Sequence, residues 1–157
     1  QEAKRTPIVY RVHDGPSLEK AAALRDFLHS IGMTLPKTDQ LRPALFNNVL
    51  KRVKDTEYER LVNEVVLRSQ AQAEYSANNY GHFGLTLRRY AHFTSPIRRY
   101  ADLIVHRSLI RALNLGSDGL PNGITPESLE EIAARISAAE RRAMAAERET
   151  VDRLIAH

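Results

Sequence analysis

The chain has 157 residues, of which 43% are hydrophobic and 27% charged, and this suits an ordinary globular domain with a buried core. It contains no cysteine, which excludes disulfides and thiolate metal sites. No apolar run approaches the roughly 20 residues that span a bilayer. We therefore expect a protein of a reducing compartment, the cytoplasm, without membrane or lipid partners.

The net charge is mild, but the positive charge is unevenly distributed. Lysine and arginine total 23 against 19 acids, giving a formal charge of +4. Between His82 and Arg111 lie six arginines, three histidines and a single acid, Asp102. Such a local basic excess favours a polyanionic partner, and a solvated arginine surface is the alternative.

The first half of the chain predicts helices. A β-prone stretch at residues 6–13 could be a strand or an extended segment. Ser17 then fits a helix N-cap, apolar residues repeat at helical spacing, and Gly32 fits the C-terminal stop. After a loop, two further helices are expected, over residues 43–54 with Pro43 in the first turn and over residues 56–74.

The second half predicts a small sheet and two helices. Turn-forming residues at 74–81 break the preceding helix. Two short strands are expected at 82–87 and 90–94, followed by a helix at 95–114 and a long final helix from Thr125 towards Ile155. The expected fold is therefore mainly α with a short β hairpin.

The most informative stretch is the predicted helix start at residues 94–100. Thr94 or Ser95 can cap a helix whose first position is Pro96, and its free N–H groups and dipole attract anions. Arg98 and Arg99 oppose that dipole by about 0.3–1 kcal/mol each, so an anion should offset them. A phosphate fits because arginine binds it with two parallel hydrogen bonds. The alternative is that both arginines form ion pairs with internal carboxylates.

Acids elsewhere carry weaker signals. Asp102 and His106 are four residues apart on one helix face, which could hold a metal but more often marks a hydrogen-bonded pair. On the last helix, Glu140 and Glu147 fall on an otherwise apolar or small stripe. A carboxylate there is costly unless paired, so we expect a structural ion pair for Glu140, with Arg141, Arg148 or arginines of the preceding helix as partners. For Glu147 the pattern does not decide.

Residues 80–103 read YGHFGLTLRRYAHFTSPIRRYADL and resemble the signature of the bacterial ribonuclease II/R family. Val105-His106-Arg107 continues the resemblance, and YRVHD at residues 10–14 and AERE at 146–149 extend it in the family's order. A shared run this long and irregular is specific. The segment Tyr90-Ala91-His92-Phe93 favours the ribonuclease R branch.

This resemblance implies a 3′-to-5′ exoribonuclease that hydrolyses single-stranded RNA to nucleoside 5′-monophosphates with divalent metal, usually Mg²⁺. Arg98 matches a catalytic arginine at the phosphate near the scissile bond. Glu147 matches a glutamate near the terminal ribose, whose 2′-hydroxyl distinguishes RNA from DNA. The other expected RNA-binding residues are Thr94, Ser95, Arg99 and, from its place beside the strand pair, His82.

Two departures from the family pattern shape the expectation. Ala101 stands where relatives often have proline, which is a small change. The family's closely spaced metal-binding aspartates and its small RNA-guiding β-barrels have no counterpart here. We therefore expect residues 1–157 to be the C-terminal part of the catalytic domain, with metal ligands in the remainder of that domain. A non-catalytic RNA-binding or structural fragment is the alternative.

Overall fold

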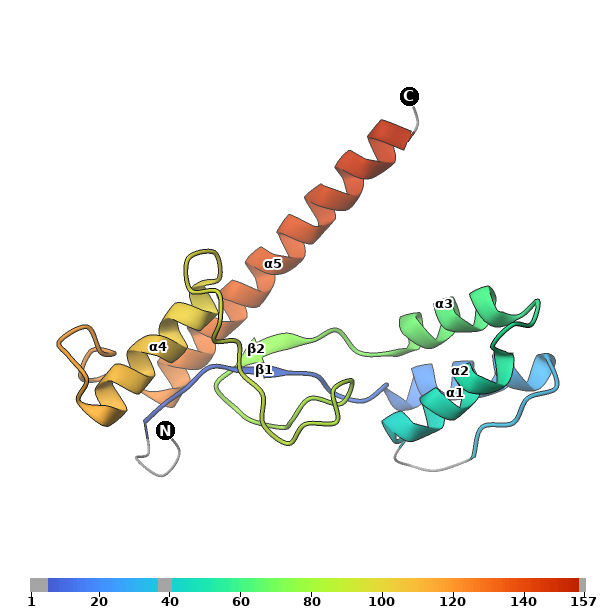
Figure 1. The fold of residues 1–157 in the computed structure, drawn as a ribbon, viewed down its shortest axis with the longest axis horizontal. Coiled ribbons are helices and arrows are strands. Elements are labelled where there is room, and N and C mark those ends of the chain that lie inside the picture. The colour runs from blue at the N-terminus through green and yellow to red at the C-terminus, as the bar shows by residue number, and fades with distance from the viewer. Residues whose placement is uncertain (1–5, 37–40, 156–157) are drawn as a thin grey trace. The chain divides into compact units, whose positions relative to one another are not determined.

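The computed structural model describes residues 6–36 and 41–155 (Figure 1). Its helices and strands, in chain order, are β1 (Tyr10–Val12), α1 (Leu18–Ser30), α2 (Pro43–Val53), α3 (Glu59–Ser69), β2 (Glu74–Ser76), α4 (Tyr100–Leu113) and α5 (Pro126–Ile155). The chain divides into two compact units. The first contains β1, β2, α4 and α5, and the second contains α1 to α3 with residues 80–88.

The mainly helical fold with a small antiparallel sheet is confirmed, but the sheet is built from other residues than expected. β1 pairs with β2, with Tyr10 opposite Ser76 and Val12 opposite Glu74. Residues 82–87 and 90–94 form no strands. His82 and Leu87 make only an isolated bridge, because residues 83–86 between them form a tight turn in which Thr86 has a φ of 57°.

Individual capping and turn residues correctly predicted where α1 begins and ends and where α2 begins. The Ser17 side chain accepts from the Lys20 N–H at 3.3 Å and opens α1, and Gly32 follows its end with a φ of 74°. Pro43 begins α2 as expected. α3 is shorter than the predicted 56–74, because residues 54–58 form turns and the chain is extended from Gln70 towards β2.

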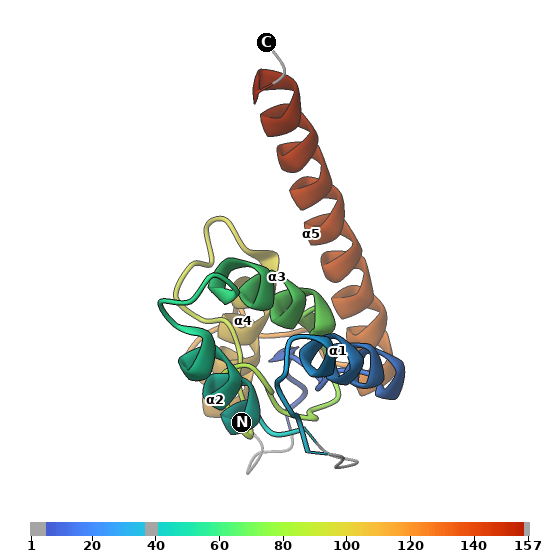
Figure 2. The ribbon, with the colours of Figure 1, turned by 90° about the vertical axis from the view of Figure 1, so that its right-hand side faces the viewer.

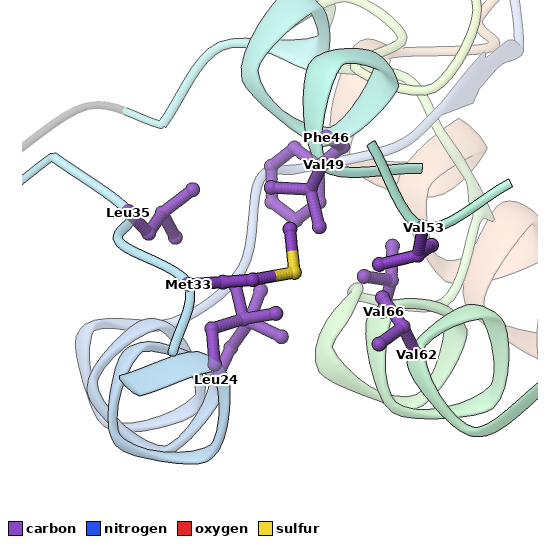
Figure 3. Packing of buried hydrophobic residues seen from close by; sticks show 9 residues of the cluster. Leu24, Met33, Leu35, Phe46, Val49, Val53, Val62 and Val66 are labelled. Atoms are coloured by element: carbon purple, nitrogen blue, oxygen red, sulfur yellow. The ribbon is translucent and has the colours of Figure 1, made fainter. Parts of the chain in front are cut away.

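One hydrophobic cluster holds the second unit together (Figure 3). Side chains of α1, α2 and α3 converge on it together with the loop after α1. The buried members are Leu24, Leu28, Met33, Leu35, Phe46, Val49, Val53, Val62 and Val66. Phe83, from the turn beside the bridge, packs edge-to-face on Phe46 with ring centroids 5.8 Å apart. This contact fixes residues 80–88 to the helices.

The first unit has its own core, in which the start of α4 and the N-terminal half of α5 pack together with β2. Its buried members are Val9, Tyr75, Ala101, Ile104, Leu120, Leu129 and Ala133. In the predicted stripe on α5, Leu129 and Ala133 are buried and Ile136 and Glu140 are partly exposed, whereas every residue from 141 to 155 is exposed. Both ribbon views show this second half of α5 extending beyond α4 (Figures 1 and 2). Over the described ranges, no helix combines the length and apolarity that a membrane crossing needs.

Candidate functional site

The segment before α4 is a turn, so the predicted helix start at Ser95 is wrong. The Ser95 carbonyl accepts from the N–H groups of Arg98 at 3.3 Å and Arg99 at 3.0 Å, which closes a turn over residues 96–98. Arg99 then adopts an extended conformation, with φ −123° and ψ 111°, and is the N-cap of α4. Pro96, whose fixed φ suits either a turn or a first helical position, therefore lies outside the helix.

Asp102 organises this turn from the first turn of α4. Its carboxylate is fully buried, and Oδ2 accepts from the Ser95 N–H at 2.8 Å and from Arg99 Nη2 at 2.9 Å. Burial alone would raise the pKa of Asp102, but these two donors outweigh it and hold the pKa below its usual value. Arg99 therefore forms an ion pair with an internal carboxylate, which was the alternative to phosphate binding. Arg98 is exposed to solvent.

His106 does not join Asp102 in a metal pair. Its Nε2 donates to the Phe93 carbonyl at 2.7 Å, and its ring stacks on the Phe93 ring with centroids 4.3 Å apart. Both residues of the predicted i,i+4 pair therefore support the segment that leads into the turn. Over residues 6–36 and 41–155, no group of three or more His, Cys, Asp or Glu is placed to hold a metal ion.

A groove of about 1080 Å³ lies in the first unit, beside the turn and along α5. It is lined by Tyr75 of β2, by residues 98–101, and by Ile132, Arg135, Ile136, Ala138, Ala139, Glu140, Arg142 and Ala143 of α5. Arg98, Arg135 and Arg142 are exposed. Within the described part of the chain these three make no ion pair, whereas Arg99 is paired with Asp102. The groove is therefore strongly cationic.

Glu140 is the acidic residue among those that line the groove, and its charge is neutralised by an arginine of β1. Its Oε2 lies 2.7 Å from Arg11 Nη1 of β1, and the Arg11 guanidinium also lies 4.6 Å from the centre of the Tyr75 ring. The expected structural ion pair of Glu140 is confirmed, but its partner comes from β1 and not from the arginines proposed. The groove keeps its positive charge because this carboxylate is already paired.

Tyr75, whose ring contacts the Arg11 guanidinium, is hydrogen-bonded to a histidine. The Tyr75 hydroxyl lies 2.8 Å from His92 Nδ1. Burial lowers the pKa of His92, and the charges of Arg99 and Arg11 lower it further. Burial raises the pKa of Tyr75. At neutral pH the pair is therefore uncharged and adds no negative charge to the wall of the groove.

The remaining predicted residues lie in different surroundings. Thr94 is exposed just before the turn, and the Ser95 N–H is used by Asp102. Glu147 is exposed on α5, one turn beyond the last groove residue, Ala143. His82 belongs to the second unit, where its ring lies 5.0 Å from the His13 ring at a separate cavity of about 480 Å³.

Several groove residues were missed from the sequence. Arg135 and Arg142 are seven residues apart, two helical turns, and this spacing alone could have placed them on one face of α5. Tyr100 is 55% exposed and lines the groove beside Arg98. Tyr75 could not have been found, because nothing in the local pattern around residue 75 indicates a strand that packs on α5.

Comparison with known proteins identifies the family. The sequence pattern described as the RNB domain matches residues 1–115, well over half of the chain. The chain belongs to the RNB domain family. The resemblance to the ribonuclease II/R family, with ribonuclease R as the nearer branch, is thereby confirmed. The RNB pattern covers the turn, Arg98 and α4, and ends before α5.

Relatives of this RNB chain are much longer than it is. Ribonuclease R of Aquifex aeolicus is 41% identical over 94% of the chain, which corresponds to 21% of that protein. Among solved structures, the apo form of Mycoplasma genitalium RNase R matches with a TM-score of 0.83 and 30% identity, covering 99% of this chain and 25% of that one. The same enzyme in complex with ribose methylated single-stranded RNA matches with a TM-score of 0.82 and 30% identity, covering 98% and 24%. The chain spans about a fifth of the curated relatives it matches.

Proposed function

We propose that this chain is part of a 3′-to-5′ exoribonuclease that hydrolyses single-stranded RNA to nucleoside 5′-monophosphates. The single observation that carries the proposal is the groove, which is lined by three arginines that make no ion pair within the described residues and by a carboxylate that is already paired. Membership of the RNB family and the RNA bound to a solved relative support RNA as the ligand. The chain would supply the phosphate and ribose contacts of the site, as the C-terminal part of the catalytic domain.

Arg98 is the proposed catalytic residue. It is the last residue of the turn, exposed and unpaired within the described residues, while Asp102 fixes the turn by accepting from the Ser95 N–H. A guanidinium held in this way can bind a phosphate with two hydrogen bonds and neutralise the charge that develops during cleavage. Thr94, Ser95, Arg99 and His82 remain proposed RNA contacts, with Arg99 also holding the turn through its ion pair.

Mg²⁺ is proposed for the whole protein, with its ligands in the remainder of the catalytic domain. Such ions lower the pKa of bound water and stabilise a leaving oxygen. The described residues offer no group of ligands to hold one, so the part proposed for them is binding and orientation of the strand. We therefore expect the 157-residue chain alone to bind RNA without cleaving it. Mg²⁺-dependent hydrolysis by a clean sample would contradict this division of roles.

The decisive experiment is Arg98→Ala in a protein that carries the complete RNB domain. A charge-assisted hydrogen bond contributes about 1.5–3 kcal/mol, so turnover of a labelled single-stranded RNA should fall by about 10- to 150-fold, with a smaller change in affinity. Arg141→Ala is the matched control, because Arg141 is an exposed arginine of α5 that does not line the groove. A loss below about fivefold for Arg98→Ala, or an equal loss for both variants, would remove the assignment.

A further inference from the structure

Two arginines of α5 line the groove, but no RNA contact has been assigned to either of them so far. Arg135 and Arg142 line the same groove as Arg98, both are exposed, and over the described ranges neither makes an ion pair. Between them the groove wall is made of Ile136, two alanines and the side chain of Glu140, whose carboxylate is paired with Arg11. The free charge on this wall is therefore entirely positive.

The helix geometry sets the distance between these two cations. Seven residues at about 1.5 Å each place their backbones roughly 10 Å apart along the helix axis and on nearly the same face. The small alanine side chains let a ligand approach the helix closely, and each guanidinium can then meet a phosphate of its own. Arginine suits this task because its planar fork matches phosphate oxygens.

We propose that Arg135 and Arg142 form a phosphate track on α5 that holds the RNA strand leading to Arg98. The proposal rests on the function proposed above and adds two binding residues to that site. These arginines act on the backbone of the strand, so they contribute to affinity without reading sequence. An acidic polypeptide is the other polyanion that such a track could hold, and the experiment below includes it.

The salt dependence of RNA affinity measures the phosphate contacts of Arg135 and Arg142 directly. Binding of a ten-residue oligouridine to the 157-residue chain is followed by fluorescence anisotropy between 50 and 200 mM salt. Each phosphate contact on a single strand contributes a slope of about −0.7 to log K against log salt. The double variant Arg135→Ala/Arg142→Ala should therefore reduce the slope by about 1.4, and each single variant by about 0.7. Alanine is a strong helix former, so α5 should persist, which circular dichroism checks.

The matched control is Arg141→Ala/Arg148→Ala, which removes the same charge from the same helix at exposed positions outside the groove lining. This pair should leave the slope almost unchanged. An equal reduction in both double variants would show a diffuse charge effect and overturn the track. Competition by polyglutamate as potent as that by oligouridine would also overturn it, because the site would then not select phosphates.

The outcome for Arg98 separates the track from the function on which it rests. If Arg98→Ala weakens RNA binding and the Arg135/Arg142 double variant does not, the groove binds RNA at the turn and the track is wrong. If the double variant reduces the slope while Arg98→Ala leaves turnover intact in the complete RNB protein, the track stands and the catalytic assignment fails. A wild-type chain that binds no oligouridine would contradict both.

Discussion

Arg11 and Glu140 are 129 residues apart in the chain, yet Arg11 Nη1 and Glu140 Oε2 lie 2.7 Å apart in the folded protein. This ion pair joins β1 to α5 at the groove, because Glu140 is one of the residues that line it. It has two consequences for the site. It fixes the strand against the helix that carries Arg135 and Arg142, and it removes the one carboxylate that would repel a phosphate there.

The first prediction is a coupling between these two residues. Arg11→Ala should weaken RNA binding, because Glu140 is then left with an unpaired negative charge in a cationic groove. Glu140 keeps 32% of its side chain exposed, so its charge is screened by water and contributes about 0.2–1 kcal/mol, and the loss should reach up to about fivefold in affinity. The double variant Arg11→Ala/Glu140→Gln should recover most of that loss. Failure of the second substitution to restore binding would show that Arg11 acts through strand packing instead.

The second prediction concerns the carboxylate of Asp102. Replacing it by asparagine removes the charge that pairs with Arg99 and accepts from Ser95, so the turn should loosen. Lost charge-assisted hydrogen bonds of this kind cost about 1.5–3 kcal/mol. Amide hydrogen exchange at Ser95 should accelerate accordingly. Asp152→Asn, at an exposed position on α5, is the control and should leave that exchange rate unchanged.

The same carboxylate predicts a pH dependence. The pKa of Asp102 is lowered in the folded state, so the folded chain binds this proton less readily than the unfolded chain does. Its stabilising contribution is complete above the ordinary aspartate pKa, near 4, and is lost as the pH falls through the lowered folded value. The difference in free energy of unfolding between wild type and Asp102→Asn should therefore shrink below about pH 4. A difference that stays constant down to the acid transition would contradict this role.

Local chemistry made part of the fold predictable. The Ser17 cap and Gly32 fixed both ends of α1, and Pro43 fixed the start of α2, because each acts on the backbone within a few residues. The start of α4 was missed, because Pro96 fits a turn as well as a helix and the choice depends on Asp102 reaching back to Ser95. Such a contact depends on burial, which the local pattern does not reveal.

The candidate site, like the fold, could be predicted only in part from the sequence. The phosphate interpretation of Arg98 began from a predicted helix start with free N–H groups, and that premise is wrong, because the N–H groups of Arg98 and Arg99 donate to the Ser95 carbonyl. The hypothesis now rests on the exposed guanidinium of Arg98 at the groove. Arg99 had two open alternatives, and burial of Asp102 decided for the ion pair. The partner of Glu140 came from β1, at a sequence separation that no helical spacing encodes. The RNA contacts themselves stay predictions.

The fourth prediction tests how residues 80–88 are held in the second unit. His13 is fixed on both sides, because Nδ1 accepts from the Gly84 N–H at 2.9 Å and Nε2 therefore donates to the Ala71 carbonyl at 2.8 Å. A Cβ at Gly84 would lie 2.9 Å from His13 Nδ1. Gly84→Ala should therefore destabilise this unit by about 1–3 kcal/mol.

Gly15→Ala is the matched control for this clash, because its added Cβ meets only the Phe83 ring at 3.5 Å, an ordinary contact. Urea unfolding, followed by NMR signals of the core valines around Val62, would compare the two variants. Equal midpoints for both would show that the His13 ring can move aside, and that it does not anchor the turn.

The last prediction concerns the choice of RNA over DNA. Glu147 is exposed on α5, one turn beyond Ala143 of the groove, and within the described residues it makes no ion pair. A carboxylate in that state can accept a hydrogen bond from a ribose 2′-hydroxyl, which DNA lacks. Because Glu147 is exposed and water screens its charge, this bond contributes only about 0.5–1.5 kcal/mol, so Glu147→Ala should reduce the preference for RNA over DNA of the same sequence by about 2- to 10-fold. Glu149→Ala removes the same charge two residues away, where the carboxylate is already paired with Arg153, and should leave the preference intact. An unchanged preference in Glu147→Ala would mean that discrimination resides in another part of the protein.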